Sequence, residues 1–306
     1  SEALAEQHPE WRLISPDGTV GGPEGIEHCH LGPLFEENLL PQLEEIAANY
    51  DIDGLFLDGL QGRPLCHCDA CRHRFATDTG KDLPAGPDDD GYCVWIRWIN
   101  ERHRQMQEQI LDRMASVRPD LAVAINYLGA PRRPQEIPAR IGFLSSDIHP
   151  DDQLFTGSYH ASYWDSLDAP FDVMNSLFLK WWGDWGVKPG LRVKQECATI
   201  LANGGRTFPA FQMYPEGTMD GAVKEALADV FAFIRAREPS VQETRAAPFA
   251  RVFWSLNAEL SRPNLLTPEA PARGAHKMLM DARLPSGFVN EETLDRTLKD
   301  CTWLII

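Results

Sequence analysis

Residues 50–75 read YDIDGLFLDGLQGRPLCHCDACRHRF, and this stretch decides the fold that the sequence predicts. Its short apolar run, residues 54–57, is typical of a buried parallel strand. The run ends in the carboxylate of Asp58, and α/β barrels place their reactive groups at such strand ends. Three cysteines follow as C-x-C-x-x-C, a spacing that indicates a metal site in the adjoining loop.

Four further segments have the same short, mostly apolar character, and segments with helical periodicity separate them. Alternating strands and helices form either a doubly wound sheet or a (β/α)8 barrel. Because no Gly-x-Gly-x-x-Gly loop follows any strand, the nucleotide-binding sheet is disfavoured. We predict the α/β class with a (β/α)8 TIM barrel, its strands at residues 54–58, 121–126, 142–147, 171–175 and 207–211.

The pattern resets after Pro239, where residues 242–248 read as a polar linker. Strand and helix patterns alternate again beyond it, which predicts the start of a second α/β domain. We therefore expect a barrel domain at residues 1–240 and a second domain at 249–306. Since a closed barrel needs eight units and five are visible, about three strands are expected to precede Ser1, and the second domain to be truncated.

Composition narrows the class of partner. The 306 residues are 43% hydrophobic, which suits a globular enzyme. The 45 acidic residues outnumber the 29 basic ones and give a net charge of -16, which opposes binding to nucleic acid and to anionic membranes. No apolar run approaches the ~20 residues of a membrane span, and the N-terminus lacks the features of a signal peptide. We expect neither partner, and the cysteine pattern favours a reducing, cytoplasmic compartment.

Three carboxylates lie at or just past the ends of different strands. In a barrel all such ends converge on one face. Glycoside hydrolysis needs two carboxyl groups, roughly 5 to 5.5 Å apart for retention of configuration and about 6.5 to 9.5 Å apart for inversion. The alternative for any one of them is a loop cap or a salt bridge. The candidate catalytic residues are Asp58, Asp147 and Glu216.

Aromatic and polar side chains follow the same strands. Aromatic faces stack on sugar rings, and amide groups can bind the hydroxyls. One or two of the tryptophans are expected in the core, but three within five residues of a predicted loop favour a sugar-binding surface. The predicted substrate contacts are Asn126, Tyr127, His149, Asn175, Trp181, Trp182 and Trp185.

The cysteine cluster supplies three thiolates, whereas tetrahedral zinc takes four ligands. Candidates for the fourth are Cys29, His67, His73 and Cys93. Cys29 is favoured because it should lie at the mouth of the preceding strand, near the loop after Asp58. Such a site would be structural, since four thiolates leave no position open for water. The alternative is a loop with unligated thiols. The predicted ligands are Cys29, Cys66, Cys68 and Cys71.

The chain resembles a known group of proteins over roughly residues 8–238. The matching features are YDIDGLFLDG followed by CHCDACRHRF, the opening HPEW with its downstream Asp17-Gly18, and LANGG near the last barrel helix. Together they resemble the glycoside hydrolases described as hypothetical glycosyl hydrolase 6. That group's barrel is related to the α-L-fucosidases of glycoside hydrolase family 29 and the β-galactosidases of family 42.

The resemblance implies specific roles. The fucosidase nucleophile of a retaining mechanism, a strand-end aspartate followed by glycine, falls on Asp58 and Gly59. The family 42 zinc cluster falls on the four cysteines named above. The segment from Phe249 resembles the flavodoxin-like trimerisation domain that follows the barrel in family 42, and this resemblance implies a homo-oligomer, a trimer as in that family.

One departure limits this transfer. Family 42 has an Asn-Glu acid/base pair where this chain has Leu57-Asp58, so its chemistry is not carried over. Asp147 is our first choice for the acid/base, Glu216 the second, and Glu136 a distant third. We thus expect a retaining glycosidase, α-L-fucosidase-like or β-galactosidase-like, acting on a glycoside or oligosaccharide. The alternative is a barrel that binds carbohydrate without cleaving it.

Overall fold

The computed structural model describes most of the chain, in two compact units. Unit 1 comprises Ser1–Val123, Glu136–Ile141 and Asn257–Leu266, and unit 2 comprises Ala124–Gln135, Gly142–Leu256 and Thr267–Ile306. The described residues are 2–21, 28–58, 60, 65–127, 134, 137–148, 152–180, 182–242, 244–261, 269–298 and 301–306.

Unit 1 is mainly helical. Proline within a helical pattern predicts a kink or a new start at Pro41, and a wide π-type turn at Phe35–Leu39 does give way to α2 at Leu40. Proline is tolerated in the first turn because its missing N–H would have no partner there. The elements are α1 (Glu2–Gln7), a 3-10 turn (Pro9–Trp11), α2 (Leu40–Asn49), β1 (Gly54–Leu57), α3 (Asp69–Thr79) and α4 (Tyr92–Val117).

Helix α4 supplies most of the core of unit 1. Its buried residues recur every three or four positions, as the sequence pattern predicts. His103 belongs to this stripe and is 7% exposed, so it packs in the interior as expected. Helices α2 and α3 both pack against α4. The buried stripe is Trp95, Ile96, Trp98, Ile99, His103, Met106, Gln107, Ile110, Leu111 and Met114.

A parallel sheet runs through β2, β3, β4 and β5, and β1 adjoins the start of β2, where the Ala122 amide donates to the Asp53 carbonyl. In the register, Asn126 is opposite Ser145, and Asp147 is opposite Met174. The predicted strands are confirmed to within about one residue at each end. Their bounds are β2 (Ala122–Asn126), β3 (Phe143–Asp147), β4 (Phe171–Ser176) and β5 (Arg206–Ala210).

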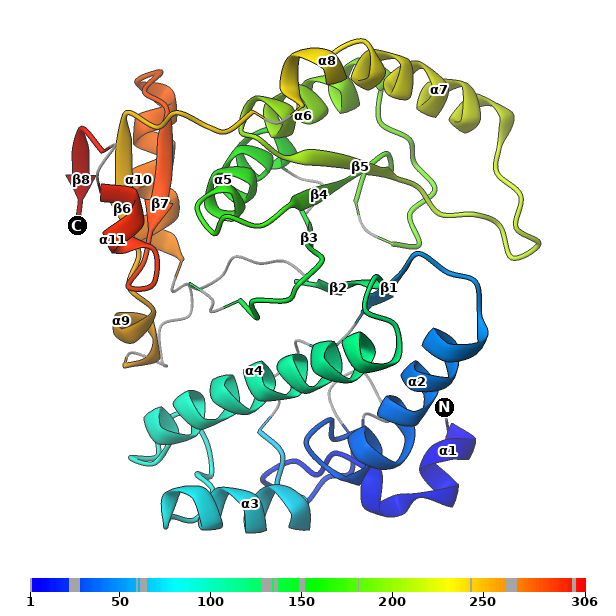
Figure 1. Ribbon diagram of the computed structural model, residues 1–306, viewed down its shortest axis with the longest axis vertical. Coiled ribbons are helices and arrows are strands. Elements are labelled where there is room, and N and C mark those ends of the chain that lie inside the picture. Colours follow the sequence, from blue (N-terminus) through cyan, green and yellow to red (C-terminus); the bar gives the residue numbers. More distant parts are fainter. Residues whose placement is uncertain are drawn as a thin grey trace. The chain divides into compact units, whose positions relative to one another are not determined.

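Helices pack against one another and against this sheet in unit 2 (Figure 1). Helix α5 packs on β4 and α6, and α6 packs on β5 and α7. The sequence Ala202-Asn203-Gly204-Gly205 predicts a helix end, and the chain does leave α6 at Asn203, with Gly204 in a left-handed φ of +83°. The helices are α5 (Gln153–Asp165), α6 (Gly190–Ala202), α7 (Gly221–Arg235) and α8 (Glu238–Val241).

A second parallel sheet, in the order β7-β6-β8, follows residue 249. Its α/β pattern agrees with the predicted class, and the division of domains near residues 240–249 stays a prediction. The apolar pattern of residues 250–256 predicts one strand, but β6 ends at Phe253, because the Glu291 carboxylate accepts the Leu256 amide hydrogen and a helix begins there. The elements are β6 (Ala250–Phe253), α9 (Leu256–Leu260), α10 (Ala270–Asp281), β7 (Ser286–Val289), α11 (Leu294–Thr297) and β8 (Trp303–Ile305).

Buried aromatic rings join α5 to this second sheet within unit 2. Tyr159 packs edge-on against Phe288 with ring centroids 5.3 Å apart. The two ring nitrogens of His276 form hydrogen bonds with the hydroxyl groups of Ser158 and Ser286. Burial lowers the pKa of the His276 imidazole to about 4. Among the helices of the described residues, none is long and apolar enough to cross a membrane.

Gly205 provides a test of this packing. A Cβ at this position would lie 2.7 Å from the Phe171 ring and 2.8 Å from Ile200. We expect Gly205→Ala to lower the free energy of unfolding by about 1 to 3 kcal/mol through overpacking, as measured by urea denaturation. Gly221→Ala is the control, because nothing lies within 4 Å of its Cβ position. Equal stability of the two variants would contradict the packing at Gly205.

Candidate functional site

Four cysteine sulfurs gather in unit 1. The Sγ atoms of Cys29, Cys66, Cys68 and Cys71 all lie within 4.8 Å of one another, and all four residues are buried. The sulfur atoms of Cys29 and Cys71 are 3.4 Å apart. Four sulfurs around one zinc ion at ~2.3 Å would be about 3.8 Å apart, so the cluster is close to the required size. These residues could therefore hold a metal ion.

Local structure explains how the four thiols meet. Cys68 immediately precedes α3 and Cys71 lies in its first turn, so the helix start presents both. The Cys29 amide donates to the Trp11 carbonyl, which holds the loop around residue 29 in place. A Cβ at Gly32 would lie 3.3 Å from the Cys29 carbonyl oxygen, tighter than an ordinary contact, so glycine suits this turn.

Among the candidates for the fourth ligand, the geometry selects Cys29. The His67 ring is committed elsewhere, because its Nε2 lies 3.0 Å from the Pro84 carbonyl oxygen. Hydrogen bonds within the cluster divide the four thiols: those with Cys29 lower the pKa of Cys66 and Cys68, whereas that with Cys66 raises the pKa of Cys29 and that with Cys29 raises the pKa of Cys71. Thiolates are the form that binds metal, so this donor set suits a soft cation.

The predicted catalytic carboxylates occupy different settings. Asp58 directly follows β1 in unit 1 and is exposed. In unit 2, Asp147 is the last residue of β3 and only 7% exposed. Glu216 is exposed on a turn after β5, where it accepts a hydrogen bond from the Thr218 hydroxyl. Strand-end placement is therefore observed for Asp58 and Asp147, whereas Glu216 lies six residues past its strand.

Three predicted substrate contacts are buried. Asn126 ends β2 and is 4% exposed, and Asn175 near the end of β4 is fully buried, with its amide 3.5 Å from the Cys197 sulfur. Tyr127 is 1% exposed and its ring packs against Trp164 with centroids 5.4 Å apart. Burial raises the pKa of the Tyr127 hydroxyl. These three side chains therefore pack in the interior near the carboxyl ends of β2 and β4.

Exposed aromatic rings follow β4 and β5. Trp182 is 47% exposed and Trp185 is 46% exposed, both on the loop after β4. The Trp185 ring stacks on Tyr214 of the loop after β5, with centroids 4.7 Å apart and planes 11° from parallel. We call the stacked pair of Trp185 and Tyr214, together with Trp182 on the same loop as Trp185, the aromatic shelf; the Trp182 ring itself packs against Phe178. The aromatic shelf offers flat apolar surface to solvent, as the sequence predicts for two of its members.

Gln212 joins the two loops that carry the aromatic shelf. Its Oε1 accepts from the Gly183 amide at 2.7 Å, and its Nε2 donates to the Asp184 carbonyl at 2.9 Å. Gly183 has a left-handed φ of +93°, which a residue with a side chain rarely adopts. The shape of the loop therefore depends on the left-handed backbone at Gly183 and on the two hydrogen bonds of Gln212. Three of the predicted site residues, Gly59, His149 and Trp181, lie outside the described residues, as does Glu136.

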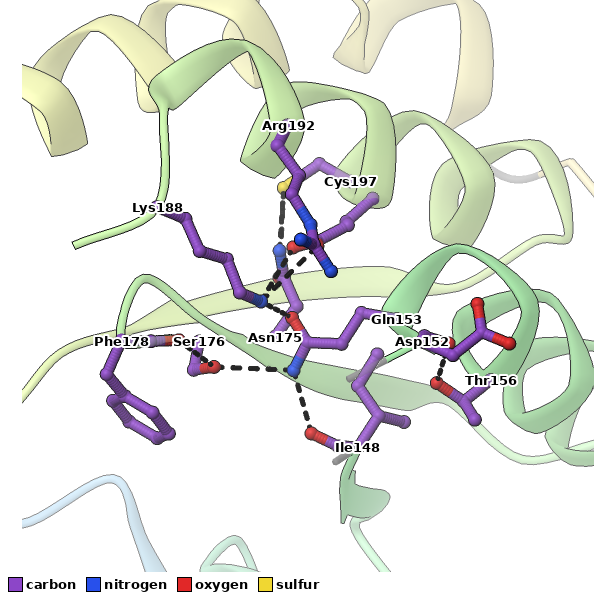
Figure 2. A network of polar contacts seen from close by, with 11 residues as sticks. Ile148, Asp152, Gln153, Thr156, Asn175, Ser176, Phe178, Lys188, Arg192 and Cys197 are labelled. Carbon is purple, nitrogen blue, oxygen red and sulfur yellow. Dashed lines mark hydrogen bonds and ion pairs between the residues drawn. The ribbon is translucent and has the colours of Figure 1, made fainter. Parts of the chain in front are cut away.

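A buried ion pair anchors the loop that carries the two tryptophans, and the sequence analysis did not find it. The side chains of Lys188 and Glu196 are both fully buried, with Nζ 3.3 Å from each carboxylate oxygen. Lys188 also donates to Gln153, whose amide in turn donates to the Ile148 carbonyl at 2.8 Å (Figure 2). Lysine two residues before a helix gives no pattern that distinguishes it from a surface residue.

The backbone beside Lys188 closes the same loop. The Lys188 amide donates to the Leu177 carbonyl at 2.7 Å, and the Leu179 amide donates to the Gly186 carbonyl at 3.1 Å. Phe178 and Val187 form an antiparallel bridge. The segment from Leu177 to Lys188 is therefore a closed loop, with both tryptophans near its tip and the buried ion pair at its base.

Comparison with known proteins yields no matching family profile and no matching curated protein. Solved structures do match. The α-L-fucosidase isoenzyme 2 from Paenibacillus thiaminolyticus is 20% identical, with a TM-score of 0.71, over 95% of this chain and 44% of that one. A β-galactosidase from Rahnella sp. R3 is 16% identical, with a TM-score of 0.76, over 95% and 53%. A GH42 β-galactosidase from G. stearothermophilus is 13% identical, with a TM-score of 0.74, over 95% and 54%.

These likenesses show the fold. The chain spans about half the length of the three proteins. The structural likenesses confirm the predicted α/β class, with parallel strands and intervening helices arranged as part of a (β/α)8 barrel. The more specific resemblance to the hypothetical glycosyl hydrolase 6 type stays a prediction.

The buried ion pair can be tested by removing one partner. Lys188→Met leaves Glu196 with only the partly exposed Arg192, whose Nε lies 3.1 Å from its Oε1, so we expect a loss of about 3 kcal/mol in the free energy of unfolding, the low end for breaking a buried pair, from urea denaturation. The double variant Lys188→Met/Glu196→Gln should recover part of that loss. Lys194→Met, which breaks a surface pair with Asp229, is the control and should cost less than about 1 kcal/mol. A single variant no worse than this control would contradict the assignment.

Proposed function

We propose that the chain is a glycosidase acting on a glycoside or an oligosaccharide with retention of configuration. The observation that carries the proposal is the placement of acidic residues at the ends of parallel strands, in a fold shared with solved fucosidase and β-galactosidase structures. The aromatic shelf adds support, because exposed stacked rings suit the apolar faces of sugars.

The roles follow from the chemistry of two carboxyl groups. Asp58 attacks the anomeric carbon, and the glycosidic C–O bond breaks as the acid/base residue protonates the leaving oxygen. The same residue then takes a proton from water, which attacks the anomeric carbon and releases Asp58. Asp147 is the preferred acid/base because it is held within a strand and shielded from solvent, whereas Glu216 lies exposed on a turn.

Turnover of aryl glycosides tests these roles. Against a panel that includes α-L-fucoside and β-D-galactoside, Asp58→Asn should lose at least about a thousandfold in kcat. Added azide should partly restore turnover, because a small anion can replace the missing nucleophile. Asp147→Asn should lose about 100- to 10,000-fold, more for substrates with poor leaving groups than for activated ones.

Asp51→Asn is the matched control, because this side chain is fully exposed in the same stretch of sequence. Wild-type turnover by Asp58→Asn would remove that residue from the mechanism. If Glu216→Gln shows the leaving-group dependence and Asp147→Asn does not, the acid/base role passes to Glu216.

Carbohydrate binding without cleavage is the second candidate. The exposed Trp185 and Tyr214 rings favour it, because such a shelf can bind sugars whether or not chemistry follows. Binding of oligosaccharides by calorimetry, weakened by Trp185→Ala and with no product after long incubation, would support it.

We also propose that the chain forms a homotrimer through the segment after Phe249 and that the protein is cytoplasmic.

We propose zinc as the occupant of the cysteine cluster, in a structural role. Four thiolates match its preferred tetrahedral donor set, and the sulfurs are close enough to surround one ion. The ion would tie the loop around residue 29 to the start of α3. Because all four positions are taken by sulfur, the site has no catalytic role in the proposal.

Metal content tests this assignment. The purified protein should hold about one zinc per chain by plasma mass spectrometry, and Cys29→Ser or Cys68→Ser should hold much less and melt at a lower temperature. Cys301→Ser is the control, because Cys301 lies outside the cluster and is only partly buried. Wild-type protein that contains no metal after expression in zinc-containing medium would contradict the assignment of zinc to the cysteine cluster.

A further inference from the structure

Two hollows lie side by side in unit 2, at the amino ends of the strands and thus at the sheet edge opposite Asp147. The first has a volume of about 530 Å³ and is lined by the starts of β4 and β5. The second, of about 500 Å³, is lined by the end of α5, the linker before β6, β6 itself and α11. They share the side chains of Asp165, Asp168 and Arg245.

Three guanidinium groups from three separate segments line the second hollow, which we call the arginine hollow. Arg245 comes from the linker, Arg251 from β6 and Arg296 from α11. Asp168 accepts from Arg245, and its other oxygen lies 3.9 Å from Arg296. Asp168 has a left-handed φ of +62°, an uncommon conformation for a residue with a side chain.

The arginine hollow carries a surplus of positive charge. Its five charged side chains are three arginines and two aspartates. Burial raises the pKa of the second aspartate, Asp165, which also accepts a hydrogen bond from the Ala246 amide. Protonation of this group would enlarge the surplus. In a chain with a net charge of -16, a cationic hollow is a local exception that attracts anions.

Arg251 has a donor without an acceptor. Its Nη1 donates to the Phe288 carbonyl at 3.4 Å, while its Nε is buried and has no hydrogen-bond partner among the described residues. Leaving a buried charged donor unpaired is unfavourable, and such groups generally point to a missing partner. An oxygen-rich anion in the hollow, which the same guanidinium lines, would balance its charge.

We propose that the arginine hollow binds a small molecule bearing an oxyanion, either a carboxylate or a phosphate. Guanidinium groups match both in shape and charge and bind them through paired N–H donors. A volume of about 500 Å³ accommodates a ligand of the size of a sugar acid or a sugar phosphate. The site shares no residue with the proposed catalytic groups, so it stands or falls independently of the glycosidase proposal.

Titration calorimetry at fixed ionic strength tests the site. Inorganic phosphate and D-glucuronate are the probes, and D-galactose is the neutral control. We expect millimolar or tighter binding of at least one anion and none of galactose. Arg296→Gln and Arg245→Gln should each weaken it about tenfold, since each removes a charged donor. Both side chains are at least 47% exposed, so these variants should fold.

Asp165→Asn provides a test in the opposite direction, because it removes a negative charge while keeping an acceptor for the Ala246 amide. It should strengthen anion binding. Arg113→Gln, at a comparably exposed arginine in unit 1, should leave affinity unchanged. Binding of phosphate alone or of glucuronate alone identifies which oxyanion the site takes. No binding of either probe, or equal affinity in Arg296→Gln and wild type, overturns the proposal.

Discussion

The in-register parallel pairing of β2 to β5 is the constraint on which the rest of unit 2 depends. Because Asp147 is paired with Met174, and Ser176 with Ala210, the carboxyl ends of three strands finish at the same edge. The loops that follow must therefore emerge together. Pro209 lies on β5, the last strand in the sheet order, where a residue without an N–H is tolerated.

The loops at this shared edge must meet two requirements. The rings of the aromatic shelf must face water to be useful, yet an exposed loop has few contacts to hold its shape. The chain resolves this by placing an ion pair at the base of the loop, where Lys188 contacts Gln153 of α5 and Glu196 of α6 and both charged side chains are fully buried. A buried ion pair adds little net stability compared with an apolar contact, but its geometry is restrictive. The contacts that hold the base of the loop thus lie beneath the surface that its aromatic rings present.

The sequence predicted well whatever depends on local pattern. The five strands and the stripe on α4 follow from periodicity, and the four cysteines follow from spacing together with the expected position of the loop at residue 29. Side-chain burial was less predictable. Tyr127 and Asn175 follow or end strands as expected, but whether such a side chain faces solvent or the interior depends on distant packing partners, here Trp164 and Cys197.

Other features have no local signal at all. The burial of Lys188 depends on Gln153, 35 positions away, and the early end of β6 depends on Glu291, 35 positions from Leu256. The arginine hollow likewise draws on residues from a helix end, a linker, a strand and a short helix. Predicting any of these features requires knowing which distant segments come into contact. Only the folded structure gives that information.

The sulfur cluster has a consequence for the unfolded chain. Cys29 and Cys71 are 42 positions apart, so an ion bound by both closes a long loop. On a loop-closure model, a permanent link of that length removes chain entropy worth about 4 kcal/mol at 25 °C. A coordinated ion supplies the same restraint reversibly. Folding of unit 1 would then be coupled to the free metal concentration of its surroundings, as a covalent bridge would not be.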